Sequence, residues 1–133
     1  MKISLISIFP DIQCYGIRTL SACLKKEGHE VDLFFLAKQY WEKYEKQTMD
    51  ELAKLTEKSD LIGISLMTNF FDNAIQVTQK LRETSNARIM WGGVHPTVRP
   101  EECLDYADMV AIGESEQAVV EVTKKIQNKQ YYY

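Results

Sequence analysis

The chain has 133 residues, of which 45% are hydrophobic and 26% charged, so it has the size and composition of one globular domain. Its net charge of -3 argues against a nucleic-acid partner, whose binding surface is usually basic. The apolar runs are far shorter than the roughly 18 residues of a membrane span, and no cleavable signal pattern follows Met1, so we expect a cytoplasmic domain without a membrane partner.

The first half of the chain alternates between strand and helix patterns. Residues 2–9 are apolar at nearly every position, which predicts a strand covered on both faces, followed by a loop over 10–14. A helix then ends before Gly28, and its predicted inward face comprises Ile17, Leu20, Ser21 and Leu24. A second strand over 30–35 leads to a helix near 48–58, whose apolar residues are Met49, Leu52 and Leu55.

An irregular aromatic segment separates this second strand from the second helix. It holds Tyr40, Trp41 and Tyr44 among charged neighbours. Such aromatics pack on a ligand or a partner domain, or form the half-buried side of a helix, and the pattern leaves these alternatives open.

The second half continues the alternation. Residues 60–66 predict a third strand, and the apolar face of the next helix comprises Phe71, Ala74, Ile75, Thr78 and Leu81. A fourth strand covers 88–91, and a short helix begins at Pro100, because proline suits the first turn and the acids after it favour its positive end. A fifth strand covers 108–112, and Ser115 is expected to cap a last helix with Ala118, Val119, Val122 and Ile126 inward.

Five strands that alternate with helices predict βαβ units and a parallel sheet. At this length the expected fold is flavodoxin-like, a three-layer α/β/α domain over residues 1–133 with five parallel strands in the order 2-1-3-4-5. Ligands of such sheets bind at the carboxyl ends of the strands. Three of the loops expected there are polar or glycine-rich, after the first, third and fourth strands, so we expect the site at this edge.

Several ligands of this fold leave recognisable loops that this chain does not have. A phosphorelay receiver needs a phosphorylatable Asp at the end of the third strand, where this chain has Ser-Leu-Met-Thr-Asn over 65–69. A flavodoxin needs a hydroxyl- and glycine-rich phosphate loop after the first strand, and a dinucleotide site needs Gly-x-Gly-x-x-Gly there; neither is present, and no P-loop is found. The function has to be inferred from what the loops do contain.

The loops contain Asp11-Ile-Gln13-Cys-Tyr-Gly16 after the first strand, Ser65-Leu-Met67 after the third and Gly92-Gly93 after the fourth. This pattern resembles the cobalamin-binding domain family, whose signature is Asp-x-His-x-x-Gly, Ser-x-Leu and Gly-Gly at these three strand ends. The resemblance implies that the serine and the Gly-Gly loop accept the displaced nucleotide tail of the cofactor, which would thread between the sheet and the first helix.

One departure from this signature changes the expected chemistry. The histidine that coordinates cobalt in the family is Gln13 here, and a neutral amide is a poor substitute for imidazole. His29 lies at the far end of the first helix and cannot replace it. The resemblance is therefore closest to the N-terminal domain of cobalamin-dependent radical SAM enzymes, which commonly lack this histidine. It implies cobalamin held base-off, with no metal ligand from this chain.

Phrases typical of that branch occur along the whole chain, each weak alone but strong in this order. They are Gly16-Ile17, Gly28-His-Glu-Val31, Asp60-Leu-Ile-Gly-Ile-Ser65, Gly92-Gly-Val-His-Pro-Thr97, Pro100-Glu-Glu102 and Gly113-Glu-Ser-Glu116. The last phrase departs from the usual Gly-Glu-Gly-Glu at Ser115.

The resemblance and the expected sheet edge together define a set of candidate cofactor-binding residues. The set is Asp11, Gln13, Gly16, Ser65, Met67, Thr68, Gly92, Gly93, His95 and Glu114. Purely structural roles stay open for these residues. The glycines also suit a tight turn, Ser65 and Thr68 suit a cap of the following turn or helix, and Asp11 and Gln13 suit a turn or an exposed loop. His95 also suits a hydrogen-bonding surface group. The glutamate is equally suited to meeting a neighbouring domain.

The resemblance implies a corrinoid carrier that presents cobalamin to a radical SAM domain of the same polypeptide, for methyl transfer or a related radical step. S-adenosylmethionine and a [4Fe-4S] cluster would belong to that domain, because Cys14, Cys23 and Cys103 do not have the Cys-x-x-x-Cys-x-x-Cys spacing. We expect no catalytic residue in this chain.

Two alternative functions stay open. The departures at Gln13 and Ser115 suit a degenerate domain that acts as a scaffold, which a retained channel for the tail would contradict. A small-molecule or nucleotide sensor would instead have a phosphate-sized pocket at the same edge.

Overall fold

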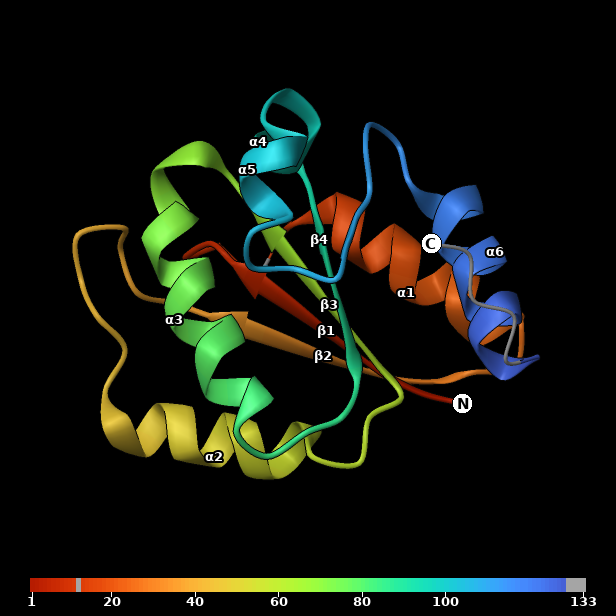
Figure 1. Ribbon diagram of the computed structural model, residues 1–133, viewed down its shortest axis with the longest axis horizontal. Coiled ribbons are helices and arrows are strands. Elements are labelled where there is room, and N and C mark those ends of the chain that lie inside the picture. Colours follow the sequence, from red (N-terminus) through yellow and green to blue (C-terminus); the bar gives the residue numbers. More distant parts are fainter. Residues whose placement is uncertain (12, 129–133) are drawn as a thin grey trace.

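Five parallel strands form one sheet in the order β2-β1-β3-β4-β5 in the computed structural model, which describes residues 1–11 and 13–128 (Figure 1). The strands are β1 (Lys2–Ile8), β2 (Glu30–Leu36), β3 (Leu61–Leu66), β4 (Arg88–Gly92) and β5 (Met109–Val110). The predicted fold class and strand order are therefore confirmed.

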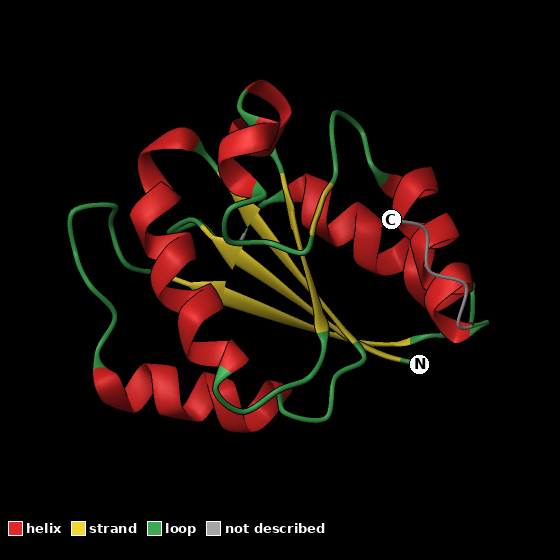
Figure 2. Cartoon of the chain, viewed as in Figure 1, coloured by secondary structure: helices red, strands yellow, loops and turns green. Residues whose placement is uncertain are grey.

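Helices cover both faces of this sheet and give the three layers (Figure 2). They are α1 (Tyr15–Lys26), α2 (Lys46–Thr56), α3 (Phe71–Arg82), α4 (Val94–Val98), α5 (Pro100–Cys103) and α6 (Glu116–Gln127), with a 3₁₀ turn at Thr68–Phe70. Helices α1 and α6 lie on one face, while α2 and α3 lie on the other (Figure 1). None of the helices described is long and apolar enough to cross a membrane.

Each face of the sheet has its own apolar core, because side chains alternate between the faces along every strand. The larger core lies under α2 and α3 and surrounds the fully buried Trp91 and Phe70. The smaller core lies under α1 and α6 and includes Leu5, Met90 and Val119. This second face carries the candidate site.

Strand β5 is shorter than the predicted range 108–112. Its two residues pair with Met90 and Trp91 of β4, and the backbone N–H groups of Asp108 and Ala111 on either side donate to the carbonyls of Ile89 and Trp91 at 2.9 Å. Beyond the pairing, Ile112 is exposed and Gly113 adopts a positive φ of 72°.

Two helix faces differ from prediction by one position. In α2, Leu55 is exposed, since Met49, Leu52, Ala53 and Thr56 already form a regular buried stripe. The Thr56 hydroxyl is accommodated there by donating to the Leu52 carbonyl at 2.9 Å. In α6, Ala118 is exposed while Val119 and Thr123 are buried, and Ser115 precedes the helix without a side-chain capping bond. The inward positions predicted for Leu55 and Ala118 are wrong.

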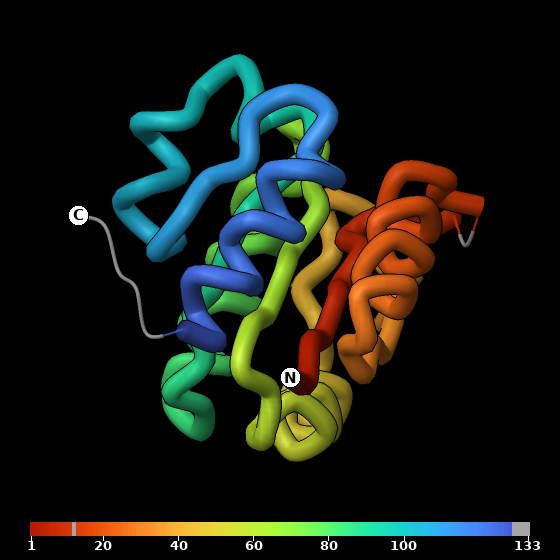
Figure 3. Tube along the Cα trace, turned by 90° about the vertical axis from the view of Figure 1, so that its right-hand side faces the viewer, coloured from red at the N-terminus to blue at the C-terminus, as the bar shows by residue number. Residues whose placement is uncertain are grey.

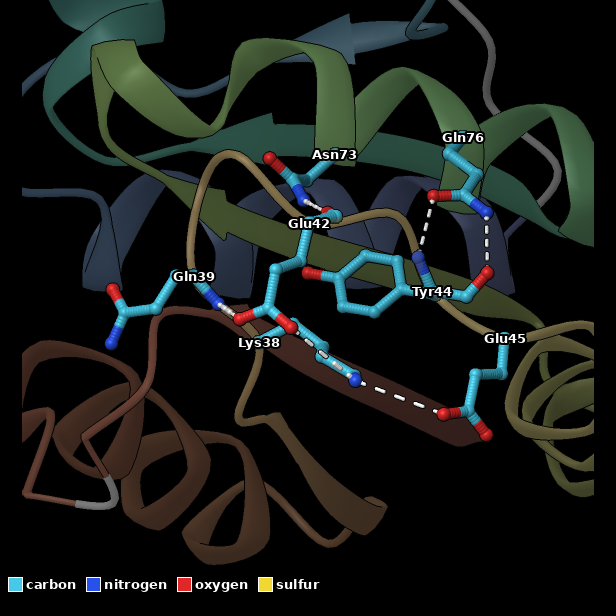
Figure 4. A network of polar contacts seen from close by, with 7 residues as sticks. All are labelled: Lys38, Gln39, Glu42, Tyr44, Glu45, Asn73 and Gln76. Carbon is cyan, nitrogen blue, oxygen red and sulfur yellow. Dashed lines mark hydrogen bonds and ion pairs between the residues drawn. The ribbon is translucent and has the colours of Figure 1, made fainter.

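The aromatic segment between β2 and α2 is fixed to α3 by amide side chains (Figure 4). Gln76 accepts from the Tyr44 backbone N–H at 3.1 Å and donates to its carbonyl at 3.0 Å, and Asn73 donates to the Glu42 carbonyl at 2.9 Å. The Tyr44 ring is buried, and this burial raises the pKa of its phenol. Tyr40 and Trp41 are exposed, and their rings meet edge to face. Of the three aromatic side chains in this segment, these two therefore lie at the surface, where a ligand or a partner could contact them.

Candidate functional site

A groove of about 280 Å³ opens between the sheet and the pair of helices α1 and α6. Figure 3 shows this face of the domain, with the two helices on either side of the strands. Five candidate residues from four different segments line it: Gly16, Ser65, Gly92, Gly93 and Glu114. The groove lies where a channel between the sheet and the first helix is expected, but α6 also forms part of its wall, which the sequence did not indicate.

Gly93 lies where the loop after β4 comes closest to β3. Its φ of 105° and ψ of -160° belong to a region that is essentially restricted to glycine. An added Cβ would lie 2.8 Å from the backbone oxygen of Leu66 and 3.2 Å from the hydroxyl of Ser65. At Gly92 the nearest atom to an added Cβ is the Ala111 methyl at 3.6 Å, an ordinary contact. The backbone therefore requires glycine at 93 but not at 92.

The short helix α4 joins the loops around the mouth of the groove, which is its open end at the carboxyl ends of the strands, beside Ser65 and Gly92. Its His95 Nδ1 lies 3.2 Å from Thr68 Oγ1, in the turn that follows β3. Its Thr97 hydroxyl donates to the Gly93 carbonyl at 2.7 Å and accepts from the Gly113 backbone N–H at 3.0 Å. The loops after β3, β4 and β5 are thus held together by side chains of one helical turn.

Replacing Thr97 by valine is expected to loosen the loop after β5. The substitution keeps the shape of the side chain but removes both hydrogen bonds, which should lower the free energy of unfolding by about 0.5–1.5 kcal/mol. The Gly113 amide should also exchange its hydrogen faster, which NMR can measure alongside urea unfolding. Thr97→Ser keeps the hydroxyl and serves as the control. Unchanged protection of Gly113 in Thr97→Val would show that the hydroxyl does not hold this loop.

His95 lies away from the groove. It is only 4% exposed, and its ring packs against Phe71 of α3 with centroids 4.9 Å apart. Among the residues that the structure describes, its Nε2 has no hydrogen-bond partner, and a carboxylate oxygen of Glu102 is 3.9 Å away. The surface position considered for this histidine is wrong, and its contacts join loops instead of facing the groove.

The other candidate residues lie in exposed parts of the same edge. The Asp11 carboxylate accepts from the Gln13 backbone N–H at 2.8 Å, which is a turn-forming bond. Gln13, Met67 and Thr68 are exposed and do not line the groove. Among the residues described, no three His, Cys, Asp or Glu side chains are grouped closely enough to hold a metal ion.

Several groove residues were not among the sequence candidates. They include Leu5, Gly63, Met90 and Val119, from β1, β3, β4 and α6. A glycine inside a predicted strand, such as Gly63, is a signal for close approach that the sequence does offer. An added Cβ at this position would lie 2.8 Å from Leu5 Cδ2. The missing side chain of Gly63 therefore leaves room at the deep end of the groove, beside Leu5.

Comparison with known proteins identifies the family. The sequence matches the family model of the B12 binding domain over residues 1–123. The chain belongs to the B12 binding domain family. No curated protein sequence matches this B12 binding domain significantly.

Solved structures share the fold of this B12 binding domain. The radical S-adenosylmethionine methyltransferase TsrM from Kitasatospora setae, solved with cobalamin and a [4Fe-4S] cluster, superposes with a TM-score of 0.80 at 18% identity. The cobalamin-dependent radical enzyme OxsB, solved with aqua-cobalamin, gives 0.75 at 18% identity. A cobalamin-binding protein from Desulfitobacterium hafniense DCB-2 gives 0.67 at 18% identity, with 94% of this chain and 58% of that chain covered. The first two matches cover 98% of this chain but only 25% and 19% of theirs, so the domain spans a quarter or less of those proteins.

Proposed function

We propose that this B12 binding domain binds cobalamin, with the nucleotide tail of the cofactor in the groove between the sheet and helices α1 and α6. The observation that carries the proposal is that Gly16, Ser65, Gly92 and Gly93, which come from three loops of the family signature, line one groove. The backbone at Gly93 has a glycine-only conformation against the end of β3, which brings the loop after β4 close to Ser65 at the groove entrance.

The residues present fit a corrinoid whose tail is displaced from cobalt. Bound cobalamin would supply a cobalt centre able to carry a methyl group. The chain's own residues would bind and orient it: the Ser65 hydroxyl at the groove entrance offers a hydrogen bond to the tail, and the glycines let backbone approach it. Gln13 is an exposed amide where the family has its histidine, so we propose a base-off state without a protein ligand to cobalt.

We further propose that a radical SAM domain of the same polypeptide receives the cofactor. This proposal is supported by the fold shared with TsrM and OxsB, in which the matching part is a minor share of a longer chain. S-adenosylmethionine and the [4Fe-4S] cluster would belong to that domain. The exposed edge residues Gln13, Met67 and Thr68, together with Glu114, would then lie between the two domains.

The groove bears on both alternative functions. A scaffold that had lost its ligand has no need of a groove for the cofactor tail, so the presence of a groove lined by the signature loops supports the corrinoid proposal. A nucleotide sensor is expected to have a phosphate-sized pocket at this edge, whereas the groove has a volume of about 280 Å³ and is lined as deep as Leu5 and Val119. Both features favour a corrinoid over the alternatives.

Titration with hydroxocobalamin and methylcobalamin, followed by absorbance and calorimetry, tests the proposal. We expect saturable binding with a dissociation constant below about 100 μM and a base-off absorbance spectrum. Gln13→Ala should leave both the affinity and the spectrum nearly unchanged, because this side chain is not proposed to coordinate cobalt. Val119→Trp, which fills the groove from α6, should abolish binding while the domain stays folded by circular dichroism. Absence of binding by the native domain at this concentration would refute the proposal.

A further inference from the structure

The floor of the groove differs chemically from its mouth. The strand register places Ser65 beside Gly92 at the mouth, and Leu5, Gly63 and Met90 in one row across three strands. This row lies two residues deeper along the strands, or roughly 7 Å from the mouth. The groove is therefore lined by polar side chains at its mouth, where the strands end, and only by apolar side chains at its floor.

The two helices repeat this gradient from polar to apolar. Each follows a parallel strand and therefore begins at the carboxyl edge of the sheet. In α6, Ser115 and Glu116 stand at the beginning, and Val119 lies one turn deeper and is buried. In α1, Gly16 stands at the beginning and Leu20 lies one turn further along the wall.

The backbone of the floor offers no substitute for polar side chains. The strands β1, β3 and β4 pair with one another through the row of Leu5, Gly63 and Met90, so their N–H and C=O groups are engaged in the sheet. The space itself exists because Gly63 has no side chain, since a Cβ there would press on Leu5 at 2.8 Å. The floor is therefore an apolar recess without hydrogen-bonding partners.

We infer that the groove selects corrinoids whose tail ends in an apolar base of the benzimidazole type over those that carry a purine. The inference rests on the proposed function and specifies which corrinoid the site takes. A purine such as adenine has several ring nitrogens and an exocyclic amino group, which would lose their water without gaining partners at the floor. The methyl groups of dimethylbenzimidazole would instead contact the side chains of Leu5, Met90 and Val119.

Three corrinoid probes test this selectivity by binding alone. Cobalamin carries dimethylbenzimidazole, adeninylcobamide carries adenine on an otherwise similar tail, and cobinamide has no nucleotide tail. We expect cobalamin to bind at least about tenfold more tightly than adeninylcobamide, the factor expected for one or more unpartnered polar groups. Equal or tighter binding of adeninylcobamide would overturn the inference and leave the proposed function intact. Failure of all three to bind would overturn both.

Variants of the floor locate the selectivity. Gly63→Ala should push Leu5 into the recess and weaken cobalamin binding about tenfold, while cobinamide binding changes less than about twofold. Val119→Ser places a hydroxyl at the floor and should narrow the preference for cobalamin over adeninylcobamide. Ile62→Val is the matched control, because Ile62 is the neighbour of Gly63 but faces the opposite core. Equal losses for cobalamin and cobinamide in Gly63→Ala would contradict a tail recess at this position.

Discussion

Gly93→Ala is expected to lower the free energy of unfolding by about 2–3 kcal/mol and to abolish corrinoid binding. The φ of 105° with a ψ of -160° is disfavoured for any residue with a Cβ. In addition, the new methyl group would lie 2.8 Å from the Leu66 carbonyl oxygen, which belongs to a paired strand and cannot move cheaply. The loop after β4 must therefore shift away from β3, which opens the mouth of the groove next to Ser65.

Urea unfolding and hydroxocobalamin titration measure the two effects of Gly93→Ala separately. Gly92→Ala is the control for stability, because its added methyl would meet Ala111 at an ordinary 3.6 Å and its φ is not positive. We expect this control to remain close to the native stability. Equal destabilisation by the two substitutions would show that the strained backbone at Gly93 is not what fixes the loop.

The fold could be predicted from sequence because its signals are local and repeated. Each apolar run that ends in a turn residue marks a strand, and five such runs alternate with helical patterns. Such a pattern allows few topologies, and the strand order followed from chain length and the preference for right-handed crossovers. The shortness of β5 could not be read in the same way, because it depends on how many of its residues pair with the neighbouring strand β4.

The site could be predicted only as an edge of the sheet and three of its loops. Gly16, Ser65, Gly92 and Gly93, which line the groove, were candidates because the family resemblance marks them and because loops after parallel strands converge at that edge. The contribution of Val119 was missed, since which helices flank a groove depends on packing between segments far apart in the sequence.

His95 shows a second limit of the sequence. Its position two residues after Gly93 suggested an exposed loop, but the turn into α4 directs its side chain to Thr68 and the ring of Phe71. A sequence gives spacing along the chain, whereas burial of a polar ring depends on which face of a short helix the core occupies.

Successive residues of strand β4 face opposite sides of the sheet, one lined by the groove and the other by the larger core. Met90 and Gly92 face the groove, while Trp91 between them faces the core under α2 and α3. This alternation predicts that substitutions on one face change mainly ligand affinity and substitutions on the other change mainly stability.

Trp91→Ala is accordingly expected to lower the free energy of unfolding by about 3–5 kcal/mol, a large share of the stability of a domain of this size. The indole is fully buried and stacks on Tyr106 with centroids 5.9 Å apart and planes at 6°. Its Nε1–H donates to the Thr78 hydroxyl at 2.9 Å. Its removal leaves a large cavity in the larger core and an unfilled face on α3. Thermal and urea unfolding measure the loss.

Thr78→Val separates the hydrogen bond of Trp91 from its packing. Valine preserves the shape of the side chain but leaves the buried indole N–H without an acceptor, which should cost about 1–3 kcal/mol. Trp91→Phe combined with Thr78→Val removes both partners of the hydrogen bond, so the double variant should lose less stability than the sum of the two single variants.

Because Thr78 lies on α3, across the sheet from the groove, its substitution should leave cobalamin affinity within about twofold of the native value. A tenfold loss of affinity in folded Thr78→Val would instead mean that the two faces of the sheet are energetically coupled, and that the larger core helps to set the shape of the groove.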